Sequence, residues 1–118
     1  VVIDHVARIG IGGEIRDADL NALCRLAGYP KVYVKVSAFY ALGRKQPPYT
    51  DLLPMIRRVH EAFGAERLMW ASDAPYQVVE PHTYRASLEL ARDGIDFLSA
   101  DERQWLLRKT AAAVFYYT

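Results

Sequence analysis

The chain has 118 residues, of which 52% are hydrophobic and 25% are charged, and its 15 basic and 14 acidic residues leave a net charge of +1. These values are typical of one globular domain and exclude a disordered or fibrous protein. The near-neutral, scattered charge and the lack of a long apolar run predict no binding to nucleic acid or membranes. A single cysteine, Cys24, excludes an internal disulfide and fits a reducing compartment, so we expect a cytoplasmic protein.

The first predicted strand is the apolar run VVIDH at residues 1–5, whose β-branched residues favour extended backbone. The chain starts inside this strand pattern without an initiator Met, and we therefore expect it to be part of a longer protein. A helix is predicted after a glycine-containing loop, with Asp17 as its cap and Gly28 as its end.

The second predicted strand is KVYVKVSAF at residues 31–39, in which valines alternate with Tyr33, Lys35 and Ser37. The valines would pack against helices, and the alternating residues would point to the opposite face of the sheet.

A polar loop leads to the next predicted helix, with Thr50 as its cap, Pro54 in its first turn and Gly64 at its end. RLMWAS at 67–72 is the third predicted strand. A helix is predicted through 82–94.

A last helix should begin at Ser99, because Ser99 and Glu102 have the spacing of a capping box. Strand and helix thus alternate three times, which predicts a parallel sheet with right-handed crossovers in one domain spanning 1–118. Part of a (β/α)₈ barrel and an open doubly wound sheet both fit this pattern, and both place their chemistry at the carboxyl ends of the strands.

Three polar residues, His5, Ser37 and Asp73, follow the three predicted strands at those ends. His5 shares strand parity with Ile3, and its imidazole could bind a metal, polarise a carbonyl or simply form a hydrogen bond at the edge of the core. The Asp73 carboxylate could bind a metal, accept a proton from water, or cap the helix after Pro75.

Other side chains near the strand ends are candidates for substrate binding. Lys35 and Ser37 would point to the same side, where the ammonium group of Lys35 could bind an anionic group or pair with a carboxylate. Arg8 could recognise a carboxylate through its planar guanidinium group, and Tyr76 could line a pocket. The remaining histidines, His60 and His82, are predicted on helical segments as surface or packing residues.

Four segments together resemble the amidohydrolase-related (amidohydrolase 2) family. VVIDHVARIG resembles its strand-six motif, VYVKVSAFY its strand seven, FGAERLMWASDAPY its strand eight, and TAAAVFYY its terminal helix. The order and spacing of all four agree over essentially the whole chain. The resemblance implies the C-terminal portion, about strands six to eight with their helices, of a (β/α)₈ barrel.

The resemblance further implies a metal-dependent or metal-assisted hydrolase, lactonase or decarboxylase acting on a small carboxylate or lactone. Asp73 matches the family's strand-eight aspartate, which binds a divalent metal, zinc in our expectation, and activates water; some relatives need no metal. His5 matches the strand-six histidine that assists water or polarises the carbonyl, and Arg8 matches a position that can hold a substrate carboxylate.

The chain also departs from the family pattern. Ala7 and Ala71 stand where glycine is usual, and Thr110 stands where asparagine is common. The strand-one His-x-His pair is absent, and His5 and Asp73 alone cannot close a metal site that needs about four ligands. We therefore expect an inactive isolated chain that self-associates, and the alternative is a noncatalytic α/β binding or scaffolding module.

Overall fold

The computed structural model describes residues 1–116, in which three parallel strands form one sheet. The strands are β1 (Val2–Ile3), β2 (Tyr33–Ser37) and β3 (Leu68–Ala71), and they lie in the order β1-β2-β3. Val2 pairs with Tyr33 on β2, and Val34 pairs with Leu68 on β3. The predicted parallel sheet is confirmed.

Each strand is shorter than its sequence pattern predicts, because the chain leaves it through left-handed backbone. β1 is followed by the turn η1 (Asp4–Arg8), in which His5 to Arg8 have φ between 50° and 60°. Ala38 (φ 59°) follows β2 directly, and Asp73 (φ 58°) follows β3 by two residues. Non-glycine residues rarely adopt this conformation, which tends to cluster at functional sites. At the carboxyl end of each of the three strands, the chain therefore continues through strained left-handed backbone.

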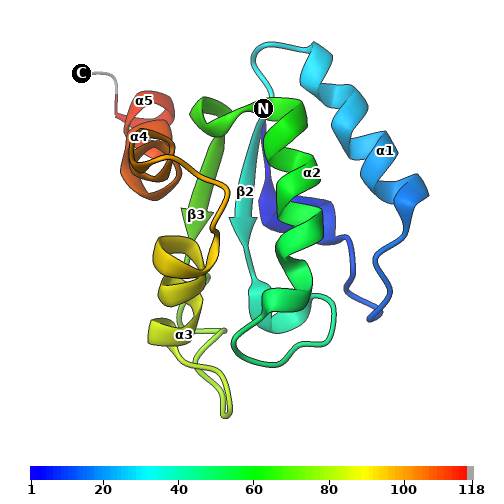
Figure 1. The fold of residues 1–118 in the computed structure, drawn as a ribbon, viewed down its shortest axis with the longest axis vertical. Coiled ribbons are helices and arrows are strands. Elements are labelled where there is room, and N and C mark those ends of the chain that lie inside the picture. Colours follow the sequence, from blue (N-terminus) through cyan, green and yellow to red (C-terminus); the bar gives the residue numbers. More distant parts are fainter. Residues whose placement is uncertain (117–118) are drawn as a thin grey trace.

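The helices are α1 (Asp17–Arg25), α2 (Leu53–Phe63), α3 (Tyr84–Glu89), α4 (Ala100–Gln104) and α5 (Thr110–Phe115). Figure 1 shows α2 beside β2, α1 on the outer side of α2, and the remaining helices on the β3 side. Short helical turns join them: η2 (Leu26–Gly28), η3 (Phe39–Ala41), η4 (Thr50–Leu52) and η5 (Ala65–Arg67). Two π-helical segments, η6 (Leu90–Gly94) and η7 (Trp105–Lys109), continue α3 and join α4 to α5.

Two predicted caps are wrong and two helix signals are confirmed. Asp17 is the first residue of α1 rather than its cap, and Thr50 lies in η4, which precedes α2. Ser99 and Glu102 form the expected reciprocal capping box at α4. Gly64 ends α2 with φ of 79°, a conformation that costs glycine little.

The predicted segments 82–94 and 99–117 differ in detail from the observed helices. Thr83 caps α3, because its hydroxyl oxygen accepts a hydrogen bond from the amide of Ala86 at 3.0 Å. His82 therefore precedes the helix and does not lie on it. The final predicted helix is interrupted by η7 and ends at Phe115, and its last residue, Tyr117, lies outside the described residues.

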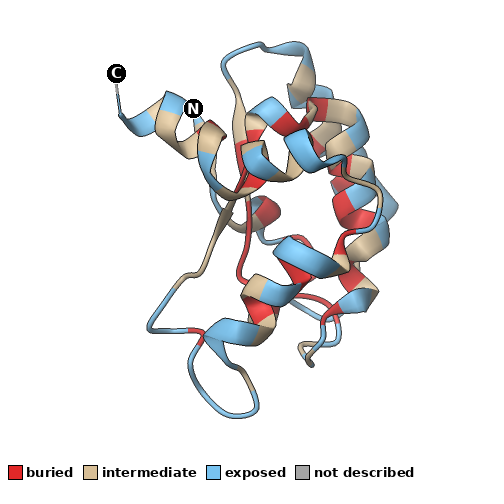
Figure 2. Cartoon of the chain, turned by 60° about the vertical axis from the view of Figure 1, so that its left-hand side comes forward, coloured by how far each residue is buried: buried red, intermediate tan, exposed pale blue. Residues whose placement is uncertain are grey.

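The core lies between the sheet and the helices, and Figure 2 shows buried residues along the strands and the facing helix sides. Val34 and Val36 are no more than 1% exposed, and on α2 they meet a stripe that includes Ile56 and Val59. Burying each such side chain contributes about 1.5–3 kcal/mol. No helix among residues 1–116 is long and apolar enough to cross a membrane.

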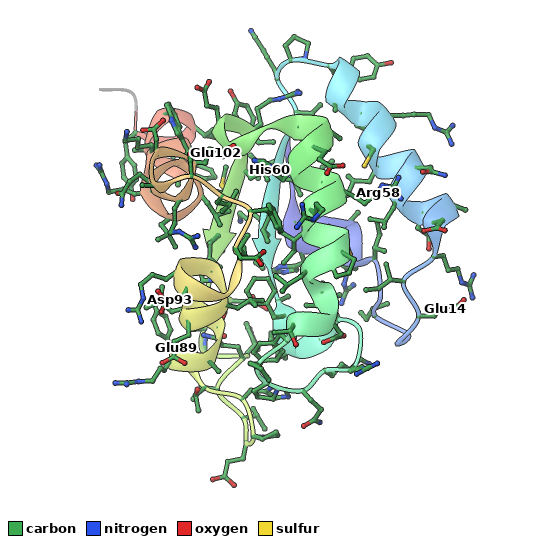
Figure 3. All side chains as sticks on the ribbon, in the orientation of Figure 1. Glu14, Arg58, His60, Glu89, Asp93 and Glu102 are labelled. Carbon is green, nitrogen blue, oxygen red and sulfur yellow. The ribbon has the colours of Figure 1, made fainter. Side chains whose placement is uncertain are left out.

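Polar contacts tie α2 to its neighbours on both sides. His60 on α2 and Glu102 on α4 point toward one another in Figure 3, with Nε2 and Oε2 2.6 Å apart. On the other side, Arg58 donates a hydrogen bond to the Asn21 side chain of α1 at 2.6 Å. The half-buried thiol of Cys24 lies 3.8 Å from the carbonyl of Arg58, so it is a packing residue of this interface.

Candidate active site

His5 and Ser37 come from neighbouring strand ends and form a hydrogen bond. The His5 Nδ1 atom lies 2.8 Å from the Ser37 hydroxyl, which is fully buried. Strand alternation alone would put His5 on the core side of the sheet with Ile3, which pairs with Val34. The left-handed turn η1 interrupts this alternation and turns the imidazole to the Ser37 face. The prediction that His5 follows the strand alternation of Ile3 is therefore wrong, although the imidazole does reach the face of the sheet on which Ser37 lies.

Asp73 lies on the other side of His5. The Asp73 Oδ2 atom is 3.9 Å from the His5 Nε2 atom and accepts a 2.7 Å hydrogen bond from the Tyr40 hydroxyl. A carboxylate facing Nε2 favours the tautomer with its proton on that nitrogen, and the Ser37 hydroxyl then donates to Nδ1. Asp73 does not cap α3, because Thr83 does. The alternative of a purely capping aspartate is thus excluded for that helix.

Tyr40 is held in its neutral, donating form. Burial, the hydrogen bond to Asp73 and the negative charge of that carboxylate together raise the pKa of Tyr40 to about 12, while Arg8 lowers it slightly. The phenol therefore keeps its proton at any physiological pH.

Lys35 is paired with a carboxylate on the same face of the sheet. Its Nζ atom lies 2.8 Å from the Asp4 Oδ1 atom, and the hydrogen bond from Lys35 is the main cause that lowers the pKa of Asp4. The sequence predicts that Lys35 binds either an anionic substrate group or a carboxylate, and in the structure its partner is the carboxylate of Asp4.

Arg8 and Tyr76 are the most exposed of the predicted site residues. Arg8 lines a surface pocket of about 620 Å³ between η1 and α1, together with Ile3, Ala7 and Leu23. That pocket is separate from the contacts between His5 and Asp73. Tyr76, in the loop after β3, is 73% exposed. Within residues 1–116, neither side chain takes part in the hydrogen bonds of His5 to Ser37 and of Tyr40 to Asp73, or in the 3.9 Å contact between His5 and Asp73 that joins them.

Three aromatic residues of the site region were missed by the sequence analysis. Tyr40 contacts Asp73 directly, its ring meets His82 edge-on at 5.9 Å, and the Tyr49 hydroxyl lies 2.7 Å from the His82 Nδ1 atom. The expectation that His82 is only a surface or packing residue is therefore too simple. The sequence signal for Tyr40 is its position shortly after the carboxyl end of β2.

A metal site is not complete within the described residues. Among residues 1–116 there is no group of three or more histidine, cysteine, aspartate or glutamate side chains placed to hold a metal ion. His5 and Asp73 could supply two ligands, whereas zinc sites have about four, including any water. The side chains present therefore do not fit a metal ion without additional ligands.

The amidohydrolase family model (Amidohydro_2) matches residues 1–116. The chain belongs to the amidohydrolase family. It is 34% identical over 106 residues to the L-fucono-1,5-lactonase of Burkholderia ambifaria, a match that covers 87% of this chain and 37% of the lactonase. The chain thus spans less than two fifths of the length of that relative.

Solved amidohydrolase structures have the same fold. A Pseudomonas putida protein assigned as a 2-pyrone-4,6-dicarboxylic acid hydrolase has a TM-score of 0.80 and 33% identity, covering 97% of this chain and 42% of its own. A Burkholderia multivorans amidohydrolase with bound zinc has a TM-score of 0.79 and 29% identity, covering 95% and 42%. The architecture is therefore that of about strands six to eight of the amidohydrolase (β/α)₈ barrel, as the sequence predicted.

Proposed function

We propose that this chain supplies the C-terminal part of the active site of a lactone hydrolase. The observation behind the proposal is the network of Ser37, His5, Asp73 and Tyr40, which joins the carboxyl ends of three parallel strands. This edge of a parallel β/α sheet is where such folds place catalytic residues. The names of the lactonase relative and the pyrone-dicarboxylate relative support a lactone as substrate.

Asp73 is the proposed general base. It accepts a proton from water while the water oxygen forms a bond to the lactone carbonyl carbon. The ring C–O bond then breaks, the leaving alkoxide oxygen takes the proton that Asp73 accepted, which restores the carboxylate, and a hydroxy acid is released. His5 donates a hydrogen bond from Nε2 to the carbonyl oxygen as negative charge develops there. Ser37, fully buried beneath His5, orients the imidazole.

Arg8, Lys35 and Tyr76 are proposed to bind the substrate. Arg8 is exposed and follows His5 by three residues, so its guanidinium group is available to a substrate carboxylate. Lys35 would act as part of its ion pair with Asp4. Tyr76 is mostly exposed and would cover a bound substrate from the loop after β3.

We propose zinc as the metal of the complete enzyme, because one solved relative contains it. Since the described residues alone do not hold a metal ion, further ligands would have to come from other segments, and no step of the proposed reaction depends on the metal.

We also propose self-association of the isolated chain through its open sheet edges, and a cytoplasmic location consistent with one free cysteine.

The decisive experiment is Asp73→Asn in the complete enzyme that contains this segment. Asparagine keeps the shape and can still accept from Tyr40, but it cannot act as a base. Turnover of a lactone should fall by roughly two to four orders of magnitude with an unchanged circular dichroism spectrum. Glu66→Gln, on η5 at the opposite end of β3, is the matched control and should retain full turnover. Near-normal turnover in a folded Asp73→Asn variant would rule out the assignment.

The second candidate is a noncatalytic α/β module. It is favoured by the absence, within residues 1–116, of any group of three or more side chains placed to hold a metal ion. If this candidate is correct, the complete protein hydrolyses no lactone before or after the substitution.

A further inference from the structure

We propose that Tyr40 is a positioning residue for Asp73 and that His82 in turn holds the ring of Tyr40. The structural claim stands on the contacts around these side chains, and its consequence for catalysis rests on the proposed function. Neither residue was among the site residues that the sequence predicted.

The side-chain contacts of Asp73 within residues 1–116 involve one of its two oxygens. The Tyr40 hydroxyl donates to Oδ2 at 2.7 Å, and the His5 Nε2 atom faces the same oxygen at 3.9 Å. Oδ1 takes part in neither contact. Tyr40 therefore selects one χ1 rotamer of Asp73, in which one carboxylate oxygen is fixed by the protein and the other is available to a water molecule.

The phenol is suited to this task because it stays protonated. Its pKa of about 12 means that it keeps its proton at neutral pH and donates a hydrogen bond there. A neutral donor holds the carboxylate without a positive charge that would weaken it as a base. Phenylalanine would fill the same space but could not hold Oδ2.

The ring of Tyr40 is itself held from behind. The imidazole of His82 meets it edge-on, with ring centroids 5.9 Å apart and an interplanar angle of 62°. His82 is fixed by Tyr49, whose hydroxyl lies 2.7 Å from Nδ1 and whose ring stacks on the imidazole at 5.8 Å. Tyr49 is 1% exposed and packs against Phe39, so this support is anchored in the core.

His82 and Asp73 lie near opposite ends of the same loop. The loop runs from 72 to 83, between β3 and the Thr83 cap of α3. Both ends of the loop therefore contact Tyr40, through the Asp73 carboxylate and the His82 ring. Tyr40 links the two ends of this loop to the carboxyl end of β2.

The test is an NMR measurement on the isotopically labelled chain at pH 7. Three-bond couplings from the Asp73 Cγ atom to its own amide nitrogen and carbonyl carbon report the χ1 rotamer. We expect values of a single rotamer in the unmodified chain and averaged values in Tyr40→Phe. Tyr29→Phe is the matched control, because Tyr29 is 65% exposed and its hydrogen bonds to Leu26, Val32 and Arg67 all involve its backbone, which the substitution leaves in place. Identical Asp73 couplings in the Tyr40→Phe and unmodified chains would overturn the proposal.

His82→Ala is a second variant that leaves the Tyr40 hydroxyl in place. Its Asp73 couplings should lie between those of the unmodified chain and those of Tyr40→Phe, and unchanged couplings would remove His82 from the proposal. Amide dispersion in the nitrogen–proton spectrum verifies that each variant is folded.

In the complete enzyme, Tyr40→Phe should lower kcat about tenfold while KM changes less than about twofold, because the base is misplaced but substrate contacts remain. An unchanged kcat would overturn the positioning role. Averaged couplings in Tyr40→Phe, combined with no lactone hydrolysis by the unmodified enzyme, would confirm the contact and contradict only the proposed function.

Discussion

Replacing Ala7 with glycine should stabilise the chain. Ala7 lies in the left-handed turn η1 with φ of 55° and ψ of 21°, and it is exposed. For an L-residue this conformation costs roughly 1–2 kcal/mol, because Cβ approaches the following carbonyl oxygen. Glycine has no Cβ and avoids this cost.

The net gain is smaller than the relieved strain, because glycine loses more backbone entropy on folding, by roughly 0.5–1 kcal/mol. The difference leaves a stabilisation of about 0.5–1 kcal/mol. Little packing is lost, since the methyl group of Ala7 faces solvent. For a domain of this size the midpoint of thermal unfolding should rise by about 2–4 °C.

The assay is thermal and urea unfolding followed by circular dichroism, with Ala22→Gly as the matched control. Ala22 is also an exposed alanine, but it lies within α1 (Asp17–Arg25), where glycine costs about 1 kcal/mol. The same chemical change should therefore have opposite signs at the two positions. If Ala7→Gly destabilises the chain as Ala22→Gly does, the left-handed turn after β1 does not exist in solution.

Three further predictions concern the rest of the chain. Hydrogen bonds from the Ser99 amide and His60 lower the pKa of Glu102 in the folded state. The ionised carboxylate therefore stabilises the fold at pH values above its ordinary pKa of 4.5, and this stabilisation is lost as the pH falls through the lowered pKa. Between about pH 6 and about pH 3, the free energy of unfolding should thus fall more steeply in the unmodified chain than in Glu102→Gln. The difference should be less than about 1 kcal/mol, because the carboxylate is accessible to solvent, and equal slopes in the two proteins would contradict this linkage. Thr110→Val should lower the free energy of unfolding in urea by about 1–2 kcal/mol, because the fully buried Thr110 hydroxyl donates to the carbonyl of Ala65 at 3.1 Å. The control is Thr50→Val, which should change it by less than about 0.5 kcal/mol because Thr50 is exposed. Calorimetry of the isolated chain with zinc should detect only weak binding, since two ligands do not close a site, and stoichiometric submicromolar affinity would refute this.

Local patterns were sufficient to predict most of the secondary structure. The alternation in β2, the apolar stripe and glycine end of α2, and the capping box of α4 depend on residues close in sequence, and the structure contains all of them. The predicted caps failed at Asp17 and Thr50 because many polar residues can cap a helix, and packing of the apolar stripe decides where the helix starts.

The sequence also determined the family and the region of the site, because the motifs around His5, Lys35 and Asp73 follow the strands in a fixed order. Only the tertiary structure decided which atoms meet. Four consecutive left-handed residues turn His5 toward Ser37, and strand alternation cannot predict such a turn. Tyr40 and Tyr49 both meet His82 from a distant part of the sequence, and a pattern read within one strand or helix contains no information on contacts between such loops. The hydrogen bond from Tyr40 to Asp73 exists because β2 and β3 are neighbours in the sheet, and that neighbourhood is a property of the folded chain.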